Sequence, residues 1–412
     1  MKSLAWLTFL IPWFTFSSSR GDDQTTTPAL QRIREVISSG EQEVRVVCFG
    51  DSVTGLYYHS GGRRAYPELI GESLAARHPV SKVTVINAGK SGHTTTNGLG
   101  RIQQDVLVHH PHLVTVMFGL NDVAKGNIDL YRKNLVEILS KCRAAGAEVI
   151  LCTPNAVSET EARPVAKVAA FAEIARSVAR EWKVPLADVH TSLETLRTED
   201  PEAWRLSMSD EIHPNLRGHR RLAESILENI EGTEVSLSDS EPVPDPLAFT
   251  VERLKRNLPV KVLAMPPFDT FASASLSALH AGAQVSTTNW PVEGLDRRLL
   301  MKDAAKRVRP LAPNLVIVSI PRSAGASDTE EFIRTQMWIA SNSLAYGKRE
   351  WDVLVVHPDV FEGRGSETDR TNDARIRTIV PAQDLPLLDR LPEDNRPAEE
   401  ILRDWIARHA GM

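Results

Sequence analysis

Residues 44–52 read VRVVCFGDS, and this short stretch decides what kind of fold the chain forms. Its first six residues are apolar and rich in β-branched side chains, apart from Arg45, which is typical of a buried β-strand. The stretch then runs directly into Gly50, Asp51 and Ser52, which are small or polar residues that favour a turn. We therefore expect a serine at the carboxyl end of a buried strand.

The same pattern recurs along the first half of the chain, where short apolar runs alternate with longer helical patterns. Further strands are predicted at 83–87, 113–118, 149–153 and, more weakly, 184–188. Apolar residues spaced three and four apart predict helices at 66–77, 130–145 and 164–182. This alternation of strands and helices predicts an α/β fold with a parallel sheet covered on both faces. In such sheets, ligands bind beyond the carboxyl ends of the strands.

Small or polar residues stand at the places where this rule puts a site. Ser52 follows the first strand, Gly89 ends the second and Asn121 follows the third, and the same half closes with Asp210 and His213 in DEIHP. A serine can attack a carbonyl group, a carboxylate can orient an imidazole base, and amide or glycine N–H groups can stabilise an oxyanion. Each residue also has an ordinary role, since serine caps helices, asparagine forms turns and a loop histidine can simply be solvated.

Taken together and in order, these four blocks resemble the SGNH hydrolase, or GDSL esterase, family. The blocks are GDS with Ser52, then Gly89, then GLND with Asn121, then DEIH with Asp210 and His213. The resemblance implies a flavodoxin-like three-layer α/β/α fold and hydrolysis of carboxylic esters without a metal or other cofactor. It also implies that Ser52 is the nucleophile, His213 the general base and Asp210 its orienting carboxylate. The oxyanion hole would consist of the backbone N–H groups of Ser52 and Gly89 and the amide of Asn121.

Spacing argues against three competing kinds of site. Gly89-Lys90-Ser91 imitates the end of a phosphate-binding loop, but the glycine required five residues earlier is replaced by Thr84. The Gly-x-Ser-x-Gly turn of the other large serine esterase class is absent from the sequence. A cluster of three histidines has no acidic or cysteine partner nearby, so a solvated helix end is favoured over a metal site; these are His109, His110 and His112.

The glycine-containing loop after Ser52 holds the candidate substrate contacts. It contains Tyr57, Tyr58, His59, Arg63 and Arg64, of which Tyr57, Arg63 and Arg64 are the three we select. Aromatic and cationic groups there would suit a sugar or an anionic ester better than a long alkyl chain. The alternative is that the loop only covers the sheet.

The chain is predicted to contain two related halves. Residues 43–232 form the catalytic half, and residues 233–258 are predicted to be an extended linker without a helix or central strand, because three prolines fall within five positions. After the linker, runs at 260–265, 313–321 and 351–360 repeat, in order, the pattern of 44–49, 111–119 and 147–156. This order indicates an internal duplication.

The second half, residues 259–412, is predicted to be a degenerate copy without catalysis. In the repeat alignment, Ser52 falls on Phe268, Asn121 on Ser323 and His213 on Pro392, so nucleophile and base are both missing. A second site built from Asp269, Ser273 and His357 lacks partners in the corresponding blocks. The alternatives left for this half are packing, self-association as a homo-oligomer, glycan binding, or a wall of the active cleft.

The N-terminus predicts export. Residues 1–20 combine Lys2, an apolar run at 4–16 and a group of small residues after it, which is typical of a cleaved signal peptide. Residues 21–42 are then an N-terminal segment before the catalytic half. The apolar run is shorter than the roughly 20 residues that cross a bilayer, so a secreted or periplasmic protein without stable membrane insertion is expected. Three cysteines lie in or beside apolar segments and are expected to be buried thiols: Cys48, Cys142 and Cys152.

Net charge and composition limit the kinds of molecule that the protein is expected to bind. The net charge of −5 and the scattered basic residues disfavour nucleic acid. The leading hypothesis is an exported serine esterase that removes O-acetyl or short acyl groups from carbohydrate, so that its partner is an acylated glycan. The alternatives are a lipid-directed acylhydrolase or lysophospholipase, and a surface-binding protein whose catalytic half has decayed.

Overall fold

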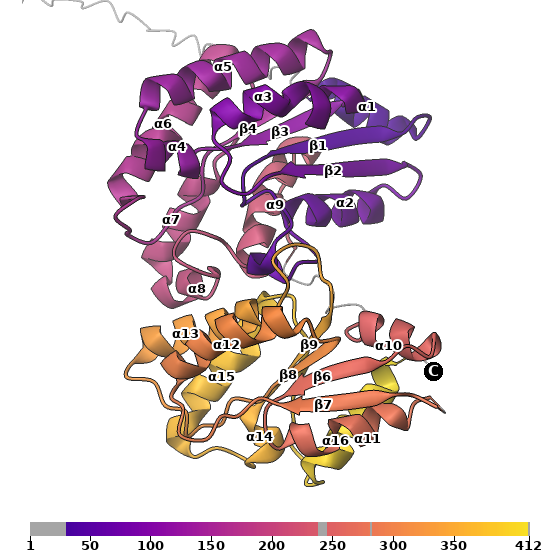
Figure 1. Ribbon diagram of the computed structural model, residues 1–412. Coiled ribbons are helices and arrows are strands. Elements are labelled where there is room, and N and C mark those ends of the chain that lie inside the picture. The colour runs from indigo at the N-terminus through magenta and orange to yellow at the C-terminus, as the bar shows by residue number, and fades with distance from the viewer. Residues whose placement is uncertain (1–29, 238–244, 281, 411–412) are drawn as a thin grey trace, which may run out of the picture.

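In the computed structural model, two parallel β-sheets, each covered by helices, follow one another along the chain (Figure 1). The structure describes residues 30–237, 245–280 and 282–410. We call residues 30–237 the first domain and residues 245–410 the second domain. The predicted signal at 1–20 lies outside the described residues, and so do Pro242 and Pro244 of the predicted linker. The predicted α/β class is confirmed in both halves.

The first sheet has five parallel strands in the order β2-β1-β3-β4-β5, which is the flavodoxin-like order. The strands are β1 (Val44–Gly50), β2 (Val83–Gly89), β3 (Leu113–Met117), β4 (Glu148–Cys152) and β5 (Leu186–Ala187). Every residue of the central strand β1 except Arg45 is buried. Gly50 pairs with Gly89 on one side and with Met117 on the other. The residues that follow these three strands therefore meet at one edge of the sheet.

Helices cover both faces of the first sheet. In Figure 1, α3, α5 and α6 lie on one face, and α2 and α9 lie on the other. The helices are α1 (Gln31–Ser39), α2 (Tyr66–Arg77), α3 (Thr95–Asp105), α4 (Leu120–Lys125), α5 (Ile128–Ala144), α6 (Val165–Trp182), α7 (Val189–Glu199), α8 (Pro201–Arg205) and α9 (Leu216–Glu231), with 3-10 turns η1 (Tyr58–Ser60) and η2 (Leu107–His109). Helix α9 follows the predicted base directly, beginning where the Asn215 side chain accepts the Gly218 N–H and ending at Gly232 in the left-handed region.

Helix α1 belongs to the core of the first domain, although the sequence analysis placed residues 21–42 in a separate segment. Ile33, Val36 and Ile37 are buried in the same apolar cluster as β1. The Arg34 side chain donates hydrogen bonds to the carbonyl oxygens of Ile230 and Asn229 at the end of α9. The first domain thus begins at least thirteen residues before the expected boundary at residue 43, since its described part starts at residue 30.

The second sheet repeats the strand order of the first. Its strands run β10-β9-β8-β6-β7, which is the order 2-1-3-4-5 read from the other edge. They are β6 (Val260–Ala264), β7 (Val285–Asn289), β8 (Leu315–Val318), β9 (Asp352–Val356) and β10 (Leu387–Leu388). The helices are α11 (Phe268–Ser277), α12 (Arg297–Leu311), α13 (Thr329–Asn342), α14 (Pro358–Phe361), α15 (Glu367–Ala382) and α16 (Ala398–His409). A shared strand order agrees with the predicted duplication, which stays an interpretation.

The predicted linker contains a helix that the sequence analysis excluded. Helix α10 (Ala248–Lys255) begins two residues after the last proline, Pro246. Leu247, Val251 and Leu254 are spaced four and three residues apart and are buried against the second sheet. The prolines disfavour a helix only where they stand, so the apolar spacing behind them decides the structure of residues 247–255.

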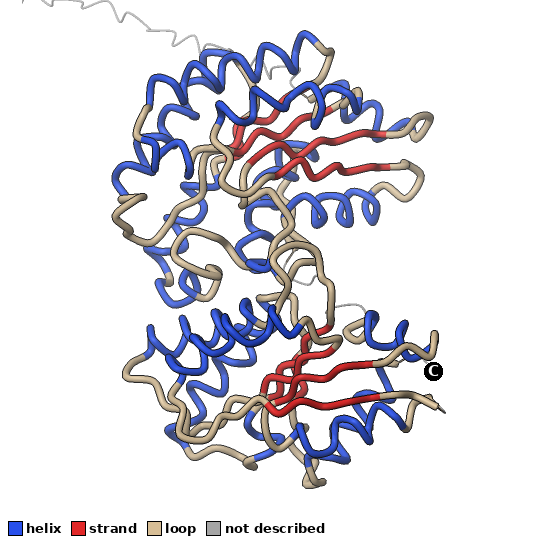
Figure 2. Tube along the Cα trace, in the orientation of Figure 1, coloured by secondary structure: helices blue, strands red, loops and turns tan. Residues whose placement is uncertain are grey.

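The two domains contact each other through α8 and the loop after it on one side and through α13 and α15 on the other. Figure 2 shows further loops, in tan, between the two sheets. A buried apolar cluster crosses the boundary; it consists of Leu206, Ile333, Met337 and Ile379. Ion pairs of Arg205 with Glu330 and of Arg375 with Glu202, both at 2.9 Å, flank this cluster. Apolar burial stabilises this contact more than the ion pairs, which reach solvent and contribute little each.

All three cysteines are free and buried, as predicted. Burial raises the pKa of their thiols, to about 12 for Cys48 and Cys142, so thiolate chemistry is disfavoured. Among the described residues, no helix has both the length and the apolar character needed to cross a membrane. The apolar run at 4–16 lies outside these residues.

The buried His219 on α9 gives the fold a predictable response to acid. Its Nδ1 atom accepts the backbone N–H of Tyr66 at 3.2 Å, and burial, reinforced by the nearby His213, lowers the pKa of His219 to about 3. An unfolded histidine binds a proton near pH 6.5, so the unfolded state holds more protons between these values and stability falls as the pH falls. We expect His219→Gln to reduce the loss of unfolding free energy between pH 7 and 4.5 by about 2 kcal/mol. Urea unfolding at both pH values measures this, and equal losses in both proteins would contradict it.

Candidate active site

The structure brings three of the predicted residues into one hydrogen-bonded chain. Ser52 lies in the turn after β1, and its Oγ atom is 2.9 Å from Nε2 of His213. On the other side of the ring, Nδ1 of His213 is 2.8 Å from Oδ2 of Asp210. Both His213 and Asp210 come from the loop before α9, about 160 residues from Ser52 in the sequence. This order of atoms can pass a proton from the serine hydroxyl to the imidazole.

The turn that carries Ser52 is fixed by its neighbours. The buried Asp51 accepts the Val53 N–H at 3.0 Å, and burial raises the pKa of this carboxyl to about 6. The buried Arg101 of α3 donates to the carbonyl oxygens of Gly50 and Ala88, which ties the ends of β1 and β2 together. These hydrogen bonds hold the turn rigidly, so Ser52 has a fixed position at the edge of the sheet.

Asp210 is held as a carboxylate. Its Oδ1 atom accepts the backbone N–H groups of Ile212 and His213 at 2.8 and 2.7 Å. Burial by itself raises the pKa of Asp210, but the charge and hydrogen bond of His213, helped by His59, lower it below the usual range. An ionised Asp210 fixes the tautomer of His213 that keeps Nε2 free to accept a proton from Ser52.

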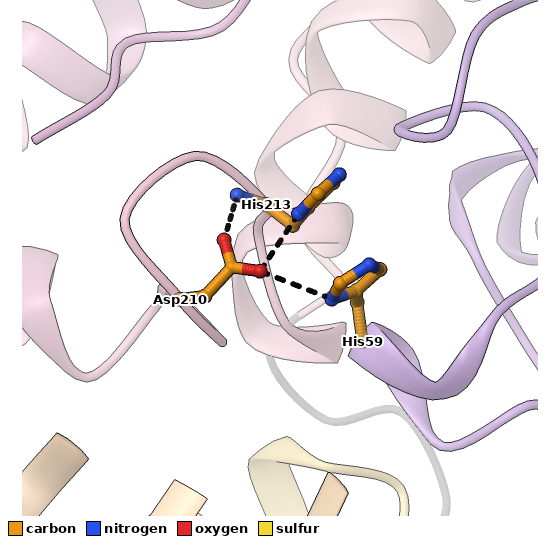
Figure 3. A group of neighbouring side chains, drawn as sticks. All are labelled: His59, Asp210 and His213. Atoms are coloured by element: carbon orange, nitrogen blue, oxygen red, sulfur yellow. Dashed lines mark hydrogen bonds and ion pairs between the residues drawn. The ribbon is translucent and has the colours of Figure 1, made fainter. Parts of the chain in front are cut away.

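A second histidine, His59 of η1, completes this group (Figure 3). Its ring stacks on that of His213 with centroids 3.7 Å apart and planes 16° apart. Its Nδ1 atom lies 3.4 Å from Oδ2 of Asp210. Burial, followed by the electrostatic influence of the neighbouring His213, lowers the pKa of His59 well below its usual value, so the ring is neutral. His59 lies in the loop of the predicted substrate contacts but was not predicted as one of them, because nothing in the local pattern links residue 59 to residue 213.

The three predicted oxyanion donors differ in whether their N–H groups already donate a hydrogen bond. In the described part of the chain, the Ser52 N–H has no hydrogen-bond acceptor. Asn121, in the first turn of α4, uses one amide N–H on the carbonyl oxygen of His93 at 3.1 Å and keeps the other. The Gly89 N–H, in contrast, donates to Oδ1 of Asn87 at 3.0 Å. The Gly89 N–H therefore already has an acceptor, and its role as an oxyanion donor stays a prediction.

Gly89 has a different reason to be glycine. A Cβ atom there would lie 2.1 Å from the backbone nitrogen of Gly55, in the loop that carries Ser52. Close approach of two backbones therefore requires glycine at this position. Of the three predicted donors, the Ser52 N–H and the second N–H of the Asn121 amide can therefore bind an oxyanion without giving up an existing hydrogen bond.

Arg163 orients Asn121, and the sequence analysis missed it. Its guanidinium donates to Oδ1 of Asn121 at 3.0 Å and to the carbonyl oxygen of Leu120 at 2.9 Å. Because Arg163 holds the amide oxygen, the amide nitrogen must point the other way. The residue stands in a loop more than 40 positions from Asn121, so no spacing signal reveals it.

We expect Arg163→Met to lower kcat for ester hydrolysis about tenfold with KM within about twofold, since the amide is free to rotate but remains present. Removing the amide altogether, in Asn121→Ala, should cost about a hundredfold to a thousandfold. Lys167→Met, an exposed change on the neighbouring α6, is the control. Steady-state kinetics on a p-nitrophenyl ester measures the three effects, and an unchanged kcat in Arg163→Met would exclude this role.

Of the three predicted substrate contacts, only Tyr57 lies beside the strand ends that carry the site. Its hydroxyl accepts the N–H of Ser91, two residues after Gly89.

Arg64 is buried, and its guanidinium pairs with Asp384 of the second domain at 2.8 Å, so the expectation that it contacts substrate is wrong. Arg63 lies near Arg349 of the same domain, whose pKa it helps to lower after burial. Both arginines belong to a contact between domains, which the first half of the sequence does not reveal.

The second domain does not assemble the residues that were considered for a second site. Asp269 accepts a hydrogen bond from Asn289, Ser273 donates to the carbonyl oxygen of Val285, and His357 accepts the N–H of Asp359. Phe268, at the position aligned with Ser52, is fully buried at the start of α11.

Two groups in the described residues have the ligand types of a metal site. One is His59, Asp210 and His213, and the other is His357, Asp359 and Asp389. In the first, His213 is engaged with Ser52 and Asp210. In the second, Arg377 pairs with both carboxylates, at 2.8 and 2.6 Å, which neutralises the charge that would attract a cation. The chemistry of both groups favours hydrogen bonding over metal binding.

Comparison with known proteins places this site in a family. The family model described as "GDSL-like Lipase/Acylhydrolase family" matches residues 48–221. The chain is also 30% identical, over 171 residues, to thioesterase 1/protease 1/lysophospholipase L1 of Escherichia coli K12, with 41% of this chain and 75% of that protein covered. The chain belongs to the GDSL-like lipase/acylhydrolase family. It is a carboxylic ester hydrolase.

Two further proteins similar to this chain are an acetylxylan esterase and a lipase/acylhydrolase of known structure. An acetylxylan esterase of Geobacillus stearothermophilus is 26% identical over 223 residues, covering 47% of this chain and 95% of that enzyme. Among solved structures, the lipase/acylhydrolase of Enterococcus faecalis is similar, with 28% identity, a TM-score of 0.41, and 46% of this chain and 96% of that chain covered. The match of the family model and the similarity to the Escherichia coli thioesterase confirm the predicted family resemblance.

Proposed function

We propose that the protein is an exported serine esterase that removes O-acetyl or other short acyl groups from carbohydrate through an acyl-enzyme. The observation that supports this most is the hydrogen-bonded chain from Ser52 through His213 to Asp210, with distances of 2.9 and 2.8 Å. This hydrogen-bonded arrangement positions His213 to take the proton of the Ser52 hydroxyl, which makes the serine a nucleophile.

In the proposed reaction, Ser52 Oγ attacks the ester carbonyl carbon while Nε2 of His213 takes its proton. The tetrahedral oxyanion accepts hydrogen bonds from the Ser52 N–H and the Asn121 amide. His213 then gives the proton to the leaving alcohol oxygen as the carbon–oxygen bond breaks, which leaves an acyl group on Ser52. Water, deprotonated by His213, attacks this acyl group, and the carboxylic acid leaves as Ser52 regains its proton. Asp210 stabilises the imidazolium in both steps.

The carbohydrate preference rests on the surroundings of Ser52. Lys90 and Ser91 are exposed at the end of β2, and the hydroxyl of Tyr57 binds the backbone beside them. Exposed polar groups and an aromatic ring suit a hydroxylated ring better than an alkyl chain. One similar protein is named an acetylxylan esterase, which supports the same choice.

Two parts of the proposal concern the cell rather than the site. We propose that the apolar run at 4–16 directs export and that the leader is removed near residue 20. N-terminal sequencing of the protein recovered from the medium or periplasm tests this, and full-length protein in the cytoplasm of the native host would contradict it.

The decisive experiment compares substrates on the full chain. Purified protein is assayed on p-nitrophenyl esters from acetate to palmitate and on acetylated xylan, with Ser52→Ala in parallel. We expect kcat/KM to fall steeply beyond butyrate and acetate to be released from the polymer. A preference for long chains would favour the lipid-directed acylhydrolase instead, and no hydrolysis of any ester would favour a decayed, surface-binding protein.

A further inference from the structure

We propose that the second domain completes the catalytic site of the first by holding His59 against His213. This inference rests on the proposed function, because it assigns residues 57–64 and their contacts in the second domain to the positioning of the general base. His59 and Tyr58 are then positioning residues, and the second domain is part of the working enzyme.

The first step is the contact between the two histidines. His59 is buried, with 7% of its surface exposed, and its ring covers one face of His213 at 3.7 Å. The general base must keep Nδ1 on Asp210 and Nε2 on Ser52 at the same time, and a flat ring packed on its face hinders rotation out of that position. The cover also keeps water from that face. Because His59 is neutral, it does not repel the imidazolium that forms during the reaction.

The second step is the support of His59 by Tyr58. The Tyr58 ring contacts that of His59, with centroids 4.0 Å apart. On its other sides, the Tyr58 ring contacts three residues of the second domain: Trp338 at 6.5 Å, Tyr346 at 6.3 Å and the Arg309 guanidinium at 5.1 Å from the ring centre. Arg309 is itself fixed, since it donates to the carbonyl oxygens of Leu344 and Ser341. A continuous series of packed groups thus runs from α12 to His213.

The third step is the backbone of the same loop. The Arg349 N–H donates to the carbonyl oxygen of Gly62 at 3.2 Å, and the Tyr58 N–H donates to that of Tyr346 at 3.4 Å. Gly61 and Gly62 have φ angles of +84° and +72°. A Cβ atom at Gly61 would lie 2.3 Å from the carbonyl oxygen of Gln383 in the second domain. This glycine pair therefore fits the loop to the second domain and not to its own sheet.

A fourth contact reaches the other end of the catalytic chain. Ser209 precedes Asp210, and its hydroxyl accepts a hydrogen bond from Nε2 of Gln383 at 3.2 Å and lies 3.4 Å from the hydroxyl of Ser341. Gln383 and Ser341 both belong to the second domain and are buried. The second domain thus touches the loop of His59 and the loop of Asp210.

The test uses full-length variants assayed on p-nitrophenyl acetate. Tyr58→Ala removes the group between the domains and His59, and Arg309→Met removes the contact from the far side, in a residue remote from substrate. We expect each to lower kcat tenfold or more with KM within about twofold, because the base is misplaced while the acyl site remains. Tyr58→Phe keeps the ring and should retain kcat within about twofold, since the contacts with His59, Trp338 and Arg309 are made by the ring.

Two controls separate positioning from general damage. Arg307→Met removes a charge from the same helix, where Arg307 pairs with Asp303, and Glu330→Gln breaks an ion pair between the domains away from Tyr58. Both should keep the wild-type kcat. Thermal unfolding of every variant identifies folded protein, and labelling of Ser52 by a fluorophosphonate reports how well the base activates the serine without any substrate. Slower labelling is expected in Tyr58→Ala and Arg309→Met alone.

Each result decides the inference. Wild-type kcat and labelling rates in both Tyr58→Ala and Arg309→Met, or equal losses in the two controls, would overturn it. If Tyr58→Ala does not fold, Arg309→Met decides alone. Ser52→Ala, run beside them, separates the two proposals. If that variant keeps its activity the serine mechanism itself is wrong, whereas an inactive Ser52→Ala with active interface variants refutes only the role of the second domain.

Discussion

Ser52→Ala is expected to lower kcat for ester hydrolysis by about ten thousandfold to a millionfold while leaving the protein folded. The hydroxyl is the atom that would form the acyl-enzyme, and no other group in the turn can replace it. Its one side-chain hydrogen bond in the described structure is to His213, so its loss removes little packing. The residual rate would come from the oxyanion donors and substrate binding.

The measurement combines kinetics with chemistry on the serine. Steady-state rates on p-nitrophenyl acetate give the loss, and mass spectrometry after fluorophosphonate treatment shows whether the covalent adduct is gone. Ser225→Ala on α9, where the hydroxyl donates to the carbonyl oxygen of Arg221 within the same helix, is the matched control and should behave as wild type. Turnover near the wild-type rate in Ser52→Ala would exclude an acyl-enzyme at this residue.

Asp210→Asn is expected to lower kcat about ten thousandfold at neutral pH, although it changes one atom. Oδ1 of Asp210 accepts two backbone N–H groups, so the asparagine oxygen will stay on that side. The amide nitrogen then faces Nδ1 of His213 and donates to it. The ring must carry its proton on Nε2, where it cannot take one from Ser52.

Glu211→Gln is the control for Asp210→Asn, because Glu211 is the exposed neighbour in the same loop. Its kcat should stay at the wild-type value. Thermal unfolding checks that Asp210→Asn keeps the loop, and the labelling rate of Ser52 should fall in parallel with kcat. If Asp210→Asn retains most of its activity with an intact melt, the carboxylate does not set the tautomer of His213.

The local sequence was sufficient for the sheet that carries the site. Strands β1 to β4 begin and end within two residues of their predicted bounds, because buried parallel strands are short apolar runs that end in small or polar residues. The same logic placed Ser52 and Asn121 at one edge, where their strands end in register. Helix α10 was missed because three prolines outweighed the apolar spacing that follows them.

Local sequence patterns account for the two α/β domains, the strand-end serine and the family blocks, since each depends on residues within one short segment. The remaining features depend on folding, because their contacts join residues far apart in the chain. Arg163 reaches Asn121 across more than 40 residues, and Arg64 reaches Asp384 across 320. His59 meets His213 only because the loop between Ser52 and α2 is docked on the second domain. Hydrogen bonds and ring stacking act over a few ångströms in space and leave no periodicity in a sequence, so no pattern in the chain could have predicted these pairs.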